Sequence, residues 1–227
     1  MRVVTWNCNL QFAHKKDTIE QYDADVLIIQ ECEKLPQDFI KGWQLFWMGN
    51  NKKKGLAVII KGDSSFINKS FDKNFTYFLP VQSEYGLILG VWSFNHRASK
   101  FGFNSNGFVV DVLNFYDELL DSTPSAIIAG DFNNNPQWDR LSFHKNNFRY
   151  ISSELEQRNF ESVYHKNFFE TYGDESNYTF FHQRNRQKKF HIDYIFSKGL
   201  ILRSCDVGSY EKWSGFSDHV PITAEFV

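Results

Sequence analysis

Short apolar runs recur along the chain, and many of them end in polar or turn-forming residues. Runs of this kind, rich in Val, Ile, Leu and aromatic side chains, are typical of buried strands. The clearest run, at residues 125–129, breaks at Gly130 into a stretch of Asp, Asn and Pro that predicts a turn. The same pattern predicts further strands at residues 2–6, 25–30, 43–48, 55–60, 66–70, 77–81, 87–94, 179–181, 190–196, 201–207 and 220–226.

Residues 105–121 show a different periodicity, with apolar side chains recurring every three or four positions. This spacing places them on one face and predicts an amphipathic helix. Asn104 or Ser105 can cap its beginning, and Pro124 bars its continuation. Shorter helical segments are expected at residues 17–22, with Asp17 as the cap, and at residues 141–144 and 151–159.

Strands separated in part by helices, with no linker-like, repeated or low-complexity segment, indicate one α/β domain over residues 1–227. The strands at 2–6 and 25–30 are joined by a short helical crossover and are expected to be parallel. The number of strands suggests two packed sheets with helices outside. Because 18% of the residues are aromatic, the core should be rich in rings.

Charge and cysteine content narrow the choice of partners and compartment. A net charge of only -2 argues against a general electrostatic hold on DNA, so a nucleic-acid site must be a local patch. The three cysteines are an odd number without a CxxC pair, which favours free thiols in a reducing compartment. With no leader-like segment and no apolar run of membrane-spanning length, the protein is expected to be soluble and cytoplasmic, without a membrane or obligate protein partner.

Several predicted strands end in groups that bind cations or phosphates. Asp131 and Asn133 follow the clearest strand and, if the strand continues, leave the same face. On this stretch alone, a tight turn held by Asx hydrogen bonds is an equally good interpretation. The same construction recurs at Asn7, at Glu31, at His191 with Asp193, which are again two residues apart, and at Asp218 with His219.

The ordered set of motifs resembles the endonuclease/exonuclease/phosphatase superfamily, which includes exonuclease III-like, DNase I-like and inositol-phosphate phosphatase enzymes. The resemblance covers essentially the whole chain, and although single tripeptides are common, their order is specific. It implies a four-layer α/β sandwich of two packed mixed β-sheets flanked by helices. The motifs are Thr5-Trp6-Asn7, Ile29-Gln30-Glu31, Gly130-Asp131-Phe132-Asn133, Ile192-Asp193-Tyr194 and Ser217-Asp218-His219-Val220-Pro221-Ile222.

Glu31 is the first candidate metal ligand. It closes an apolar strand, where a carboxylate needs solvent, a partner or a cation. Oxygen and amide donors suit Mg²⁺ or Mn²⁺, and the chain lacks a Cys/His set spaced for zinc. The resemblance implies that Glu31 and Asn7 border the metal position and that Asp218 or Asp131 completes it. An ion pair at the mouth of the strand is the alternative interpretation of Glu31.

His219 is the candidate for contacting the scissile phosphate. The resemblance pairs it with Asp193, whose carboxylate would fix the tautomer and favour the imidazolium. The pair can act as a general base on water or as a cation that stabilises added negative charge. Asp131 is a rival for positioning the attacking water, with Asn133 donating to a phosphate oxygen.

Other positions match the family less closely. His96, or Asn95 beside it, falls where many members place a group that contacts the phosphate or leaving group, although a loop histidine is an equal alternative. His191 stands where the family often has Arg, and it remains a candidate substrate contact. Asn9 stands where abasic-site enzymes often carry Asp, which leaves a second metal position open.

Residues 178–190 alternate rings with bases and include Arg184 and Arg186. They predict either a rim that contacts phosphates while a ring stacks on a base, or a hairpin with inward aromatics and a soluble basic tip. A related Tyr-Thr-aromatic-aromatic stretch in exonuclease III-like enzymes favours nucleic acid. Residues 52–54, three lysines, are interpreted as a solvated hairpin tip, with phosphate contact as the alternative.

The sequence therefore predicts a Mg²⁺- or Mn²⁺-dependent phosphodiester hydrolase acting on nucleic acid, preferably DNA. An endo- or exonuclease of DNA repair or turnover is the form considered. A phosphatase or phosphodiesterase for a small or lipid phosphate is the first alternative. A catalytically silent nucleic-acid-binding module is the second, and it is disfavoured because the candidate site residues are all of reactive types.

Overall fold

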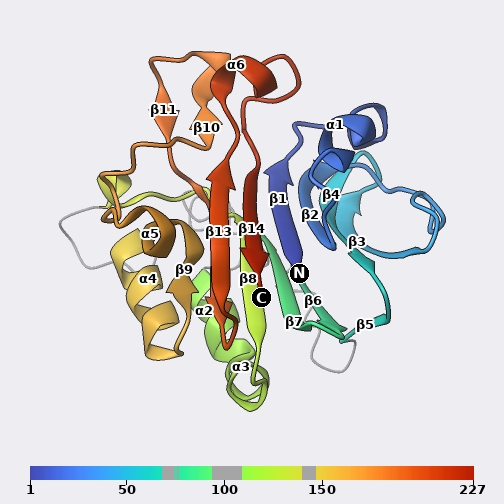
Figure 1. The fold of residues 1–227 in the computed structure, drawn as a ribbon, viewed down its shortest axis with the longest axis horizontal. Helices are drawn as coiled ribbons and strands as arrows, with labels where there is room; N and C mark the ends of the chain where they lie inside the picture. The colour runs from blue at the N-terminus through green and yellow to red at the C-terminus, as the bar shows by residue number, and fades with distance from the viewer. Residues whose placement is uncertain (68–74, 76, 94–108, 140–146) are drawn as a thin grey trace.

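The structure, a computed structural model, describes residues 1–67, 75, 77–93, 109–139 and 147–227. Its main feature is a pair of mixed six-stranded sheets packed face to face (Figure 1). The first sheet has the order β13-β14-β1-β2-β4-β3, from strands Arg2–Asn7 (β1), Val26–Cys32 (β2), Trp43–Asn51 (β3), Lys54–Lys61 (β4), Leu202–Val207 (β13) and Ile222–Phe226 (β14).

The second sheet has the order β5-β6-β7-β8-β12-β9. Both sheets have a parallel pair at their centre, β1 with β2 and β7 with β8, next to antiparallel neighbours. The strands of the second sheet are Ser64–Phe66 (β5), Phe78–Ser83 (β6), Gly86–Trp92 (β7), Ala126–Asp131 (β8), Glu161–Ser162 (β9) and Asp193–Lys198 (β12).

Three apolar clusters hold the layers together. The cluster between the sheets consists mainly of β-branched and leucine side chains, including Val58, Ile88 and Ile127, all without solvent exposure. Side chains of alternating residues point to opposite faces of a strand, so the other face of each sheet is left for helices to cover. This explains why the central strands read as nearly continuous apolar runs.

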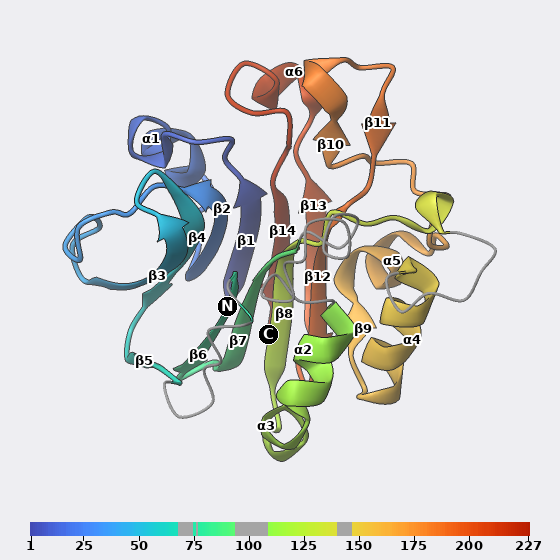
Figure 2. The same cartoon turned by 180° about the vertical axis from the view of Figure 1, so that it is seen from behind.

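Helices cover the outer face of each sheet. On the first sheet, Phe12–His14 (η1), Lys16–Glu20 (α1) and Tyr210–Trp213 (α6) contribute Phe12, Ile19 and Trp213 to the outer core. On the second, Val109–Phe115 (α2), Asp117–Ser122 (α3) and Phe148–Gln157 (α4) pack on the outer face of the sheet, with α2 in front of the sheet in Figure 2. The remaining short elements are Pro136–Trp138 (η3), Val163–Phe168 (α5), Phe180–Phe181 (β10), His182–Arg184 (η4) and Lys189–Phe190 (β11).

The fold expected from the resemblance is confirmed, with local differences. The helix predicted at 105–121 is interrupted at Tyr116 within its described part, where Asn, aromatic and Asp residues favour the helix weakly. The short helix near residue 17 begins at Lys16, and Asp17 lies in its first turn and does not cap it. The strand predicted at 190–196 is divided, because Phe190 pairs with Phe180 in a separate hairpin.

Four predicted segments fall partly or wholly outside the described residues: the end of the strand at 66–70, the last residue of the strand at 87–94, the start of the helix at 105–121 with its cap at Asn104 or Ser105, and the helical turn at 141–144. Within the described part of the chain, the helices are all too short or too polar to cross a membrane.

Gly130 lies in β8, where the backbone of the neighbouring strand β7 leaves no room for a side chain. Its φ is +148°, and a Cβ placed there would lie 1.8 Å from the carbonyl oxygen of Val91 and 3.0 Å from Nε2 of Gln30. The first contact is with the backbone of the neighbouring strand, which cannot move without breaking the β7–β8 pairing. A side chain at this position therefore separates the strands directly before Asp131.

Replacing Gly130 with Ala is expected to destabilise the protein by about 2–4 kcal/mol, through backbone strain and the clash with Val91. Urea unfolding followed by tryptophan fluorescence measures the change. Gly215→Ala is the matched control, because a Cβ there meets nothing within 4 Å and should change the unfolding free energy by less than about 0.5 kcal/mol. Equal stability of the two variants would show that Gly130 is not under this constraint.

Candidate active site

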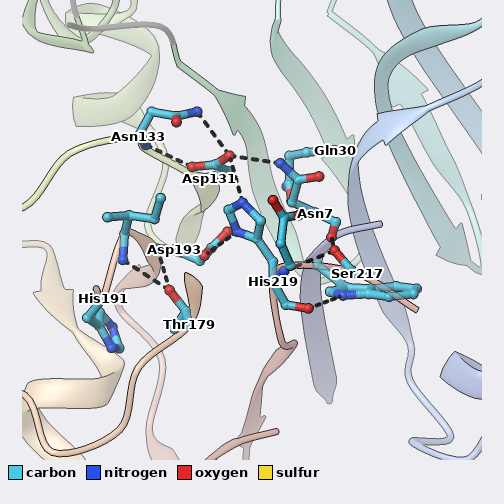
Figure 3. Close-up of polar contacts among 12 residues, drawn as sticks. Asn7, Gln30, Asp131, Asn133, Thr179, His191, Asp193, Ser217 and His219 are labelled. Atoms are coloured by element: carbon cyan, nitrogen blue, oxygen red, sulfur yellow. Dashed lines mark hydrogen bonds and ion pairs between the residues drawn. The ribbon is translucent and has the colours of Figure 1, made fainter. Parts of the chain in front are cut away.

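Polar residues from both sheets converge at one end of the molecule. Asn7 ends β1, Asp131 ends β8, Asp193 begins β12, and His219 lies shortly before β14. Figure 3 shows their side chains pointing toward one another between the two sheets. The strand ends meet because β1, β2, β7 and β8 run toward this end while β12 and β14 run away from it.

Asp131 is the centre of a buried hydrogen-bond network. The Nδ2 amide of Asn7 donates to Oδ2 of Asp131 across 2.9 Å, which joins the first sheet to the second. Asn133 donates its backbone N–H to Oδ1 at 2.8 Å and its side-chain amide to Oδ2 at 3.0 Å. These three hydrogen bonds therefore fix the orientation of the Asp131 carboxylate.

Asn133 reaches Asp131 by a turn and not by continuation of the strand. Its φ of +47° is in the left-handed region, so the expectation of a shared strand face is wrong although the side chains do meet. The Asx-type hydrogen bond considered from the sequence is present. The Nδ2 amide also donates to the carbonyl of Ser93 at 2.9 Å, so both of its hydrogens have partners within the protein.

His219 and Asp193 form a second buried pair between the sheets. Nδ1 of His219 lies 2.9 Å from Oδ2 of Asp193, and Nε2 lies 4.0 Å from Oδ2 of Asp131. The imidazole therefore lies between two carboxylates, with one ring nitrogen bound and the other facing Asp131. Oδ1 of Asp193 is buried and has no hydrogen-bond partner.

Hydroxyl groups hold both members of this pair in place. Oγ1 of Thr179, itself fully buried, accepts from the backbone N–H groups of Ile192 and Asp193 at 3.0 and 3.1 Å. Ser217 accepts from the backbone N–H of His219 at 3.0 Å and donates to the carbonyl of Asn7 at 2.8 Å. Thr179 therefore holds the backbone at Asp193, and Ser217 connects His219 to the end of β1.

Burial and neighbouring charges together raise the pKa values of both Asp131 and His219. Burial, with the nearby charge of Asp193, raises the pKa of Asp131 to about 7. Burial alone would lower the pKa of His219, but the Asp193 carboxylate at hydrogen-bond distance, supported by Asp131, raises it to about 10. At neutral pH the imidazole is therefore cationic, while Asp131 exchanges its proton near neutrality.

Glu31 lies at a bulge in the first sheet. The pairing of β2 with β4 shifts register between Gln30 and Cys32, and Glu31, between them, has a φ of +57°. A non-glycine residue with this backbone is strained, and such bulges often re-aim a side chain near a functional site. The Glu31 carboxylate lies 3.0 Å from Nζ of Lys54, so the ion pair considered from the sequence is present.

Asp218 belongs to the same end of the site through Asn9. The side-chain amide of Asn9 donates to Oδ1 of Asp218 at 3.0 Å, and its backbone N–H donates to Oδ1 of Asn7 at 3.1 Å. Asn9, Leu10 and Gln11 all have positive φ, which folds this segment tightly over the end of β1. Asn7 and Glu31 lie on neighbouring parallel strands, where Asn7 pairs with Gln30.

Two groups of residues carry the donor types that bind a cation. Glu31, Asn7 and Asp218 offer two carboxylates and an amide oxygen, a set that suits a hard ion such as Mg²⁺ or Mn²⁺. Asp131, Asp193 and His219 form a second group, with ligand atoms within 4.8 Å of one another. Both groups are partly engaged within the protein: His219 pairs with Asp193, Glu31 pairs with Lys54, and Asn7 and Asp218 each accept from Asn9.

The remaining sequence candidates do not join the cluster. The expectation that His191 shares a face with Asp193 is wrong, because its ring packs against Tyr164 with Nδ1 2.8 Å from the carbonyl of Asn177. Figure 3 shows the His191 ring pointing away from Asp193 and His219. Burial lowers the pKa of His191, which disfavours the charged ring. Asn95 and His96 lie outside the described residues.

Arg184 and Arg186 belong to the segment that joins β10 to β11, and Figure 1 shows this hairpin beside α6. Arg184 donates to the carbonyl of Gly215 at 3.4 Å, and Arg186 forms an ion pair of 2.8 Å with Glu211. Both are exposed, so the basic tip expected from the sequence is present. The ring of Phe180, at the base of the hairpin, lies 4.6 Å from that of His219.

Four residues of the site contribute through contacts that the sequence did not predict. Thr179 and Ser217 act through buried hydroxyls, and Lys54 lies within what reads as a lysine-rich hairpin tip. Gln30, fully buried, donates to Oγ1 of Thr5 at 3.0 Å and touches Gly130 of the other sheet. A Gln inside an otherwise apolar strand was the signal for this residue.

Three solved structures of other proteins are similar to this chain over its whole length. The chain matches solved structures of a 3'-5' exonuclease (NExo) from Neisseria meningitidis (20% identity, TM-score 0.75) and an AP endonuclease from Archaeoglobus fulgidus (19%, 0.73). A 3' phosphatase NExo (D146N) from Neisseria, bound to product DNA hairpin, matches at 21% and 0.78. Each match covers 100% of this chain and 99% of the other.

At these identities the solved structures establish the fold and nothing finer. Among curated proteins, no sequence matches the chain. The profile of the Endonuclease/Exonuclease/phosphatase family matches residues 4–219, which is nearly the whole chain and includes every residue of the cluster. The chain belongs to the endonuclease/exonuclease/phosphatase family.

Proposed function

We propose that this protein is a divalent-metal-dependent phosphodiester hydrolase that acts on nucleic acid, with DNA preferred. The observation that carries the proposal is the buried pair of contacts between the sheets, Asn7 with Asp131 and His219 with Asp193, beside Glu31. Family membership supports the reaction class, since its name joins nucleases with phosphatases. The solved structures support a nucleic-acid substrate, because one of them holds a DNA hairpin product.

Asp131 is the group suited to orient and deprotonate the attacking water. Its carboxylate is fixed by Asn7 and Asn133, and its pKa of about 7 allows proton exchange at neutral pH. Asn133 was expected to donate to a phosphate oxygen, but both of its amide hydrogens are engaged within the protein. We therefore assign Asn133 to positioning Asp131.

His219 is assigned to stabilising negative charge on the phosphate. A pKa of about 10 keeps the imidazole protonated at neutral pH, which favours the cation over the general base. Asp193 holds the ring through Nδ1, so Nε2 remains available to donate to an oxygen of the reacting phosphate. Asp193 thus positions His219 and maintains its charge.

Glu31, Asn7 and Asp218 are the residues that would hold Mg²⁺ or Mn²⁺. When bound, the ion neutralises the phosphate and polarises one of its oxygens. These three donors lie on the first sheet and in the segment before β14, while Asp131 and Asp193 lie on the second. The proposed site therefore places the cation on one sheet and the catalytic carboxylate on the other.

The β10–β11 hairpin is the element suited to contact nucleic acid outside the reacting phosphate. Its exposed Arg184 and Arg186 supply charge in a chain whose net charge is -2, which meets the requirement for a local basic patch. Phe180 connects this hairpin to the ring of His219. His191, buried behind Asp193, is no longer proposed as a substrate contact.

Cleavage of labelled single-stranded, duplex and abasic-site DNA, beside RNA and an inositol-phosphate panel, tests this function. We expect Mg²⁺-dependent cleavage of at least one DNA substrate and loss of activity with EDTA. Hydrolysis of an inositol phosphate without cleavage of any nucleic acid would replace the proposal with the small-phosphate alternative. Binding of DNA without turnover of any substrate would point to the silent module.

His219→Ala and Glu31→Ala are each expected to lower kcat by about 10²–10⁴-fold, because they remove the stabilising cation and a metal ligand. Circular dichroism should show that both variants fold. His14→Ala and Glu20→Ala are the controls, because both residues are exposed and lie outside the site. Near-normal turnover in either site variant would remove that residue from the proposed mechanism.

The charge state of His219 is predicted to depend on Asp193. The pKa of its imidazole is about 10 in the folded protein and ordinarily 6.5, so the folded state holds the proton more tightly. This contribution to stability is complete below pH 6.5 and is lost as pH rises through 10. NMR titration of the metal-free protein should therefore show His219 still protonated at pH 8.

Asp193→Asn should lower the pKa of His219 toward or below neutrality, since burial then acts without its main opposing charge. Exposed His14 serves as the reference resonance and should be unchanged between the two proteins. A His219 resonance that titrates below pH 7 in the parent protein would refute the assignment of His219 as a permanent cation.

A further inference from the structure

Lys54 places an ammonium group against the carboxylate of Glu31, the first of the residues proposed to hold the cation. Its Nζ lies 3.0 Å from Oε1 of Glu31 and 5.0 Å from the centre of the Trp92 ring. Trp92 ends β7 and pairs in register with Asp131. The ammonium therefore lies between the end of the first sheet, at Glu31, and the end of the second, beside Asp131.

The backbone around Lys54 is built to hold it there. Bulges interrupt both pairings of this corner, between Gln30 and Cys32 on one side and between Met48 and Asn51 on the other. Trp47 covers Gly55, where a Cβ would lie 2.5 Å from its ring, and donates its indole N–H to the carbonyl of Cys32 at 3.0 Å. The same ring therefore braces the residues that follow both Glu31 and Lys54.

The contact differs from an ordinary surface ion pair. The side chain of Glu31 is only 19% exposed, and that of Lys54 is 41% exposed, so the carboxylate is held near the protein interior while the ammonium has room to leave. The Trp92 ring also attracts the ammonium through its face. Because the Glu31 carboxylate is fixed and the Lys54 ammonium can move, another cation can replace the ammonium.

We propose that the Lys54 ammonium is an internal competitor for the metal position at Glu31 and becomes a contact for the substrate phosphate once a divalent ion displaces it. The inference deepens the proposed function and depends on its assignment of the metal to Glu31. A divalent ion and an ammonium cannot share one carboxylate closely without strong repulsion. Binding of the ion therefore weakens the contact of Lys54 with Glu31 and favours movement of the ammonium away from it.

The arriving phosphate supplies the opposite charge that the displaced ammonium lacks. Lys54 remains next to Trp92 at the junction of the sheets, close to the Asp131 end of the site, where the reacting phosphate is proposed to bind. The lysine thus couples metal and substrate: it weakens metal binding to the free protein and strengthens binding of the phosphate to the metal-loaded protein. A variant that lacks the lysine charge should therefore bind the metal more tightly and the substrate phosphate more weakly.

Lys54→Gln tests this coupling, because it removes the charge and keeps a polar chain of similar length. Mn²⁺ binding to the metal-free protein is measured from the electron paramagnetic resonance signal of free Mn²⁺, without substrate. We expect Lys54→Gln to bind Mn²⁺ about tenfold more tightly than the parent protein, since the competing charge is gone. At saturating Mn²⁺, KM for DNA should rise. The slope of log KM against log salt concentration should fall by the amount that corresponds to about one phosphate contact.

Lys61→Gln is the matched control, because Lys61 ends the same strand and loses an equivalent ion pair with Asp23 and Asp25. It should bind Mn²⁺ within about twofold of the parent protein, which separates the local effect from the change in net charge. Lys54→Arg should keep the parent affinity. A purely structural role for Lys54 predicts weaker Mn²⁺ binding in Lys54→Gln, and this result would overturn the inference.

Glu31→Gln distinguishes failure of the inference from failure of the proposed function. If Glu31→Gln loses Mn²⁺ binding while Lys54→Gln binds as the parent does, the inference fails and the metal assignment stands. If Glu31→Gln binds Mn²⁺ as tightly as the parent, the proposed metal position is wrong and the inference falls with it.

Discussion

The hydrogen bond from Asn7 to Asp131 is the contact on which the site depends. It connects the end of β1 in one sheet to the end of β8 in the other, and both side chains are buried. An unpaired carboxylate at this depth would be costly, and without its partners Asp131 would have no fixed orientation. The apolar layer between the sheets sets their separation, and this bond with the His219–Asp193 pair sets how their polar ends meet.

Strained backbone occurs at several residues of the site. Glu31, Asn133 and Asn9 have positive φ, although none is glycine. The backbone N–H groups of Asn133 and Asn9 donate to Asp131 and Asn7, and each such conformation costs on the order of 1 kcal/mol or more. The apolar core between and outside the sheets provides the stability that tolerates them. The geometry of the site is therefore imposed by the fold.

The sequence predicted the strands well because their apolar runs are buried on both faces, as at residues 126–129. It also placed Asn7, Asp131, Asp193 and His219 at the ends of such runs, and the structure brings their side chains together. It did not predict the orientation of His191, because a two-residue spacing implies a shared face only within a regular strand, and the chain leaves β11 before β12 begins.

The sequence also could not predict contacts that depend on how strands distant along the chain pair with one another. Lys54 reaches Glu31 only because β2 and β4 pair with a bulge between Gln30 and Cys32. The hydroxyl of Thr179 reaches the backbone of Asp193 because the β10–β11 hairpin folds over the start of β12. In both cases the residue type is ordinary, and only the three-dimensional pairing gives it a role.

In the proposed function, Glu31, Asn7 and Asp218 bind the cation, and Asp193 pairs through Oδ2 with the charged ring of His219 and takes no metal. Anomalous diffraction from crystals soaked in Mn²⁺ tests this division most directly. We expect a peak at coordination distance, about 2.0–2.3 Å, from the Glu31 carboxylate. A peak between Asp131, Asp193 and His219, with none at Glu31, would contradict it.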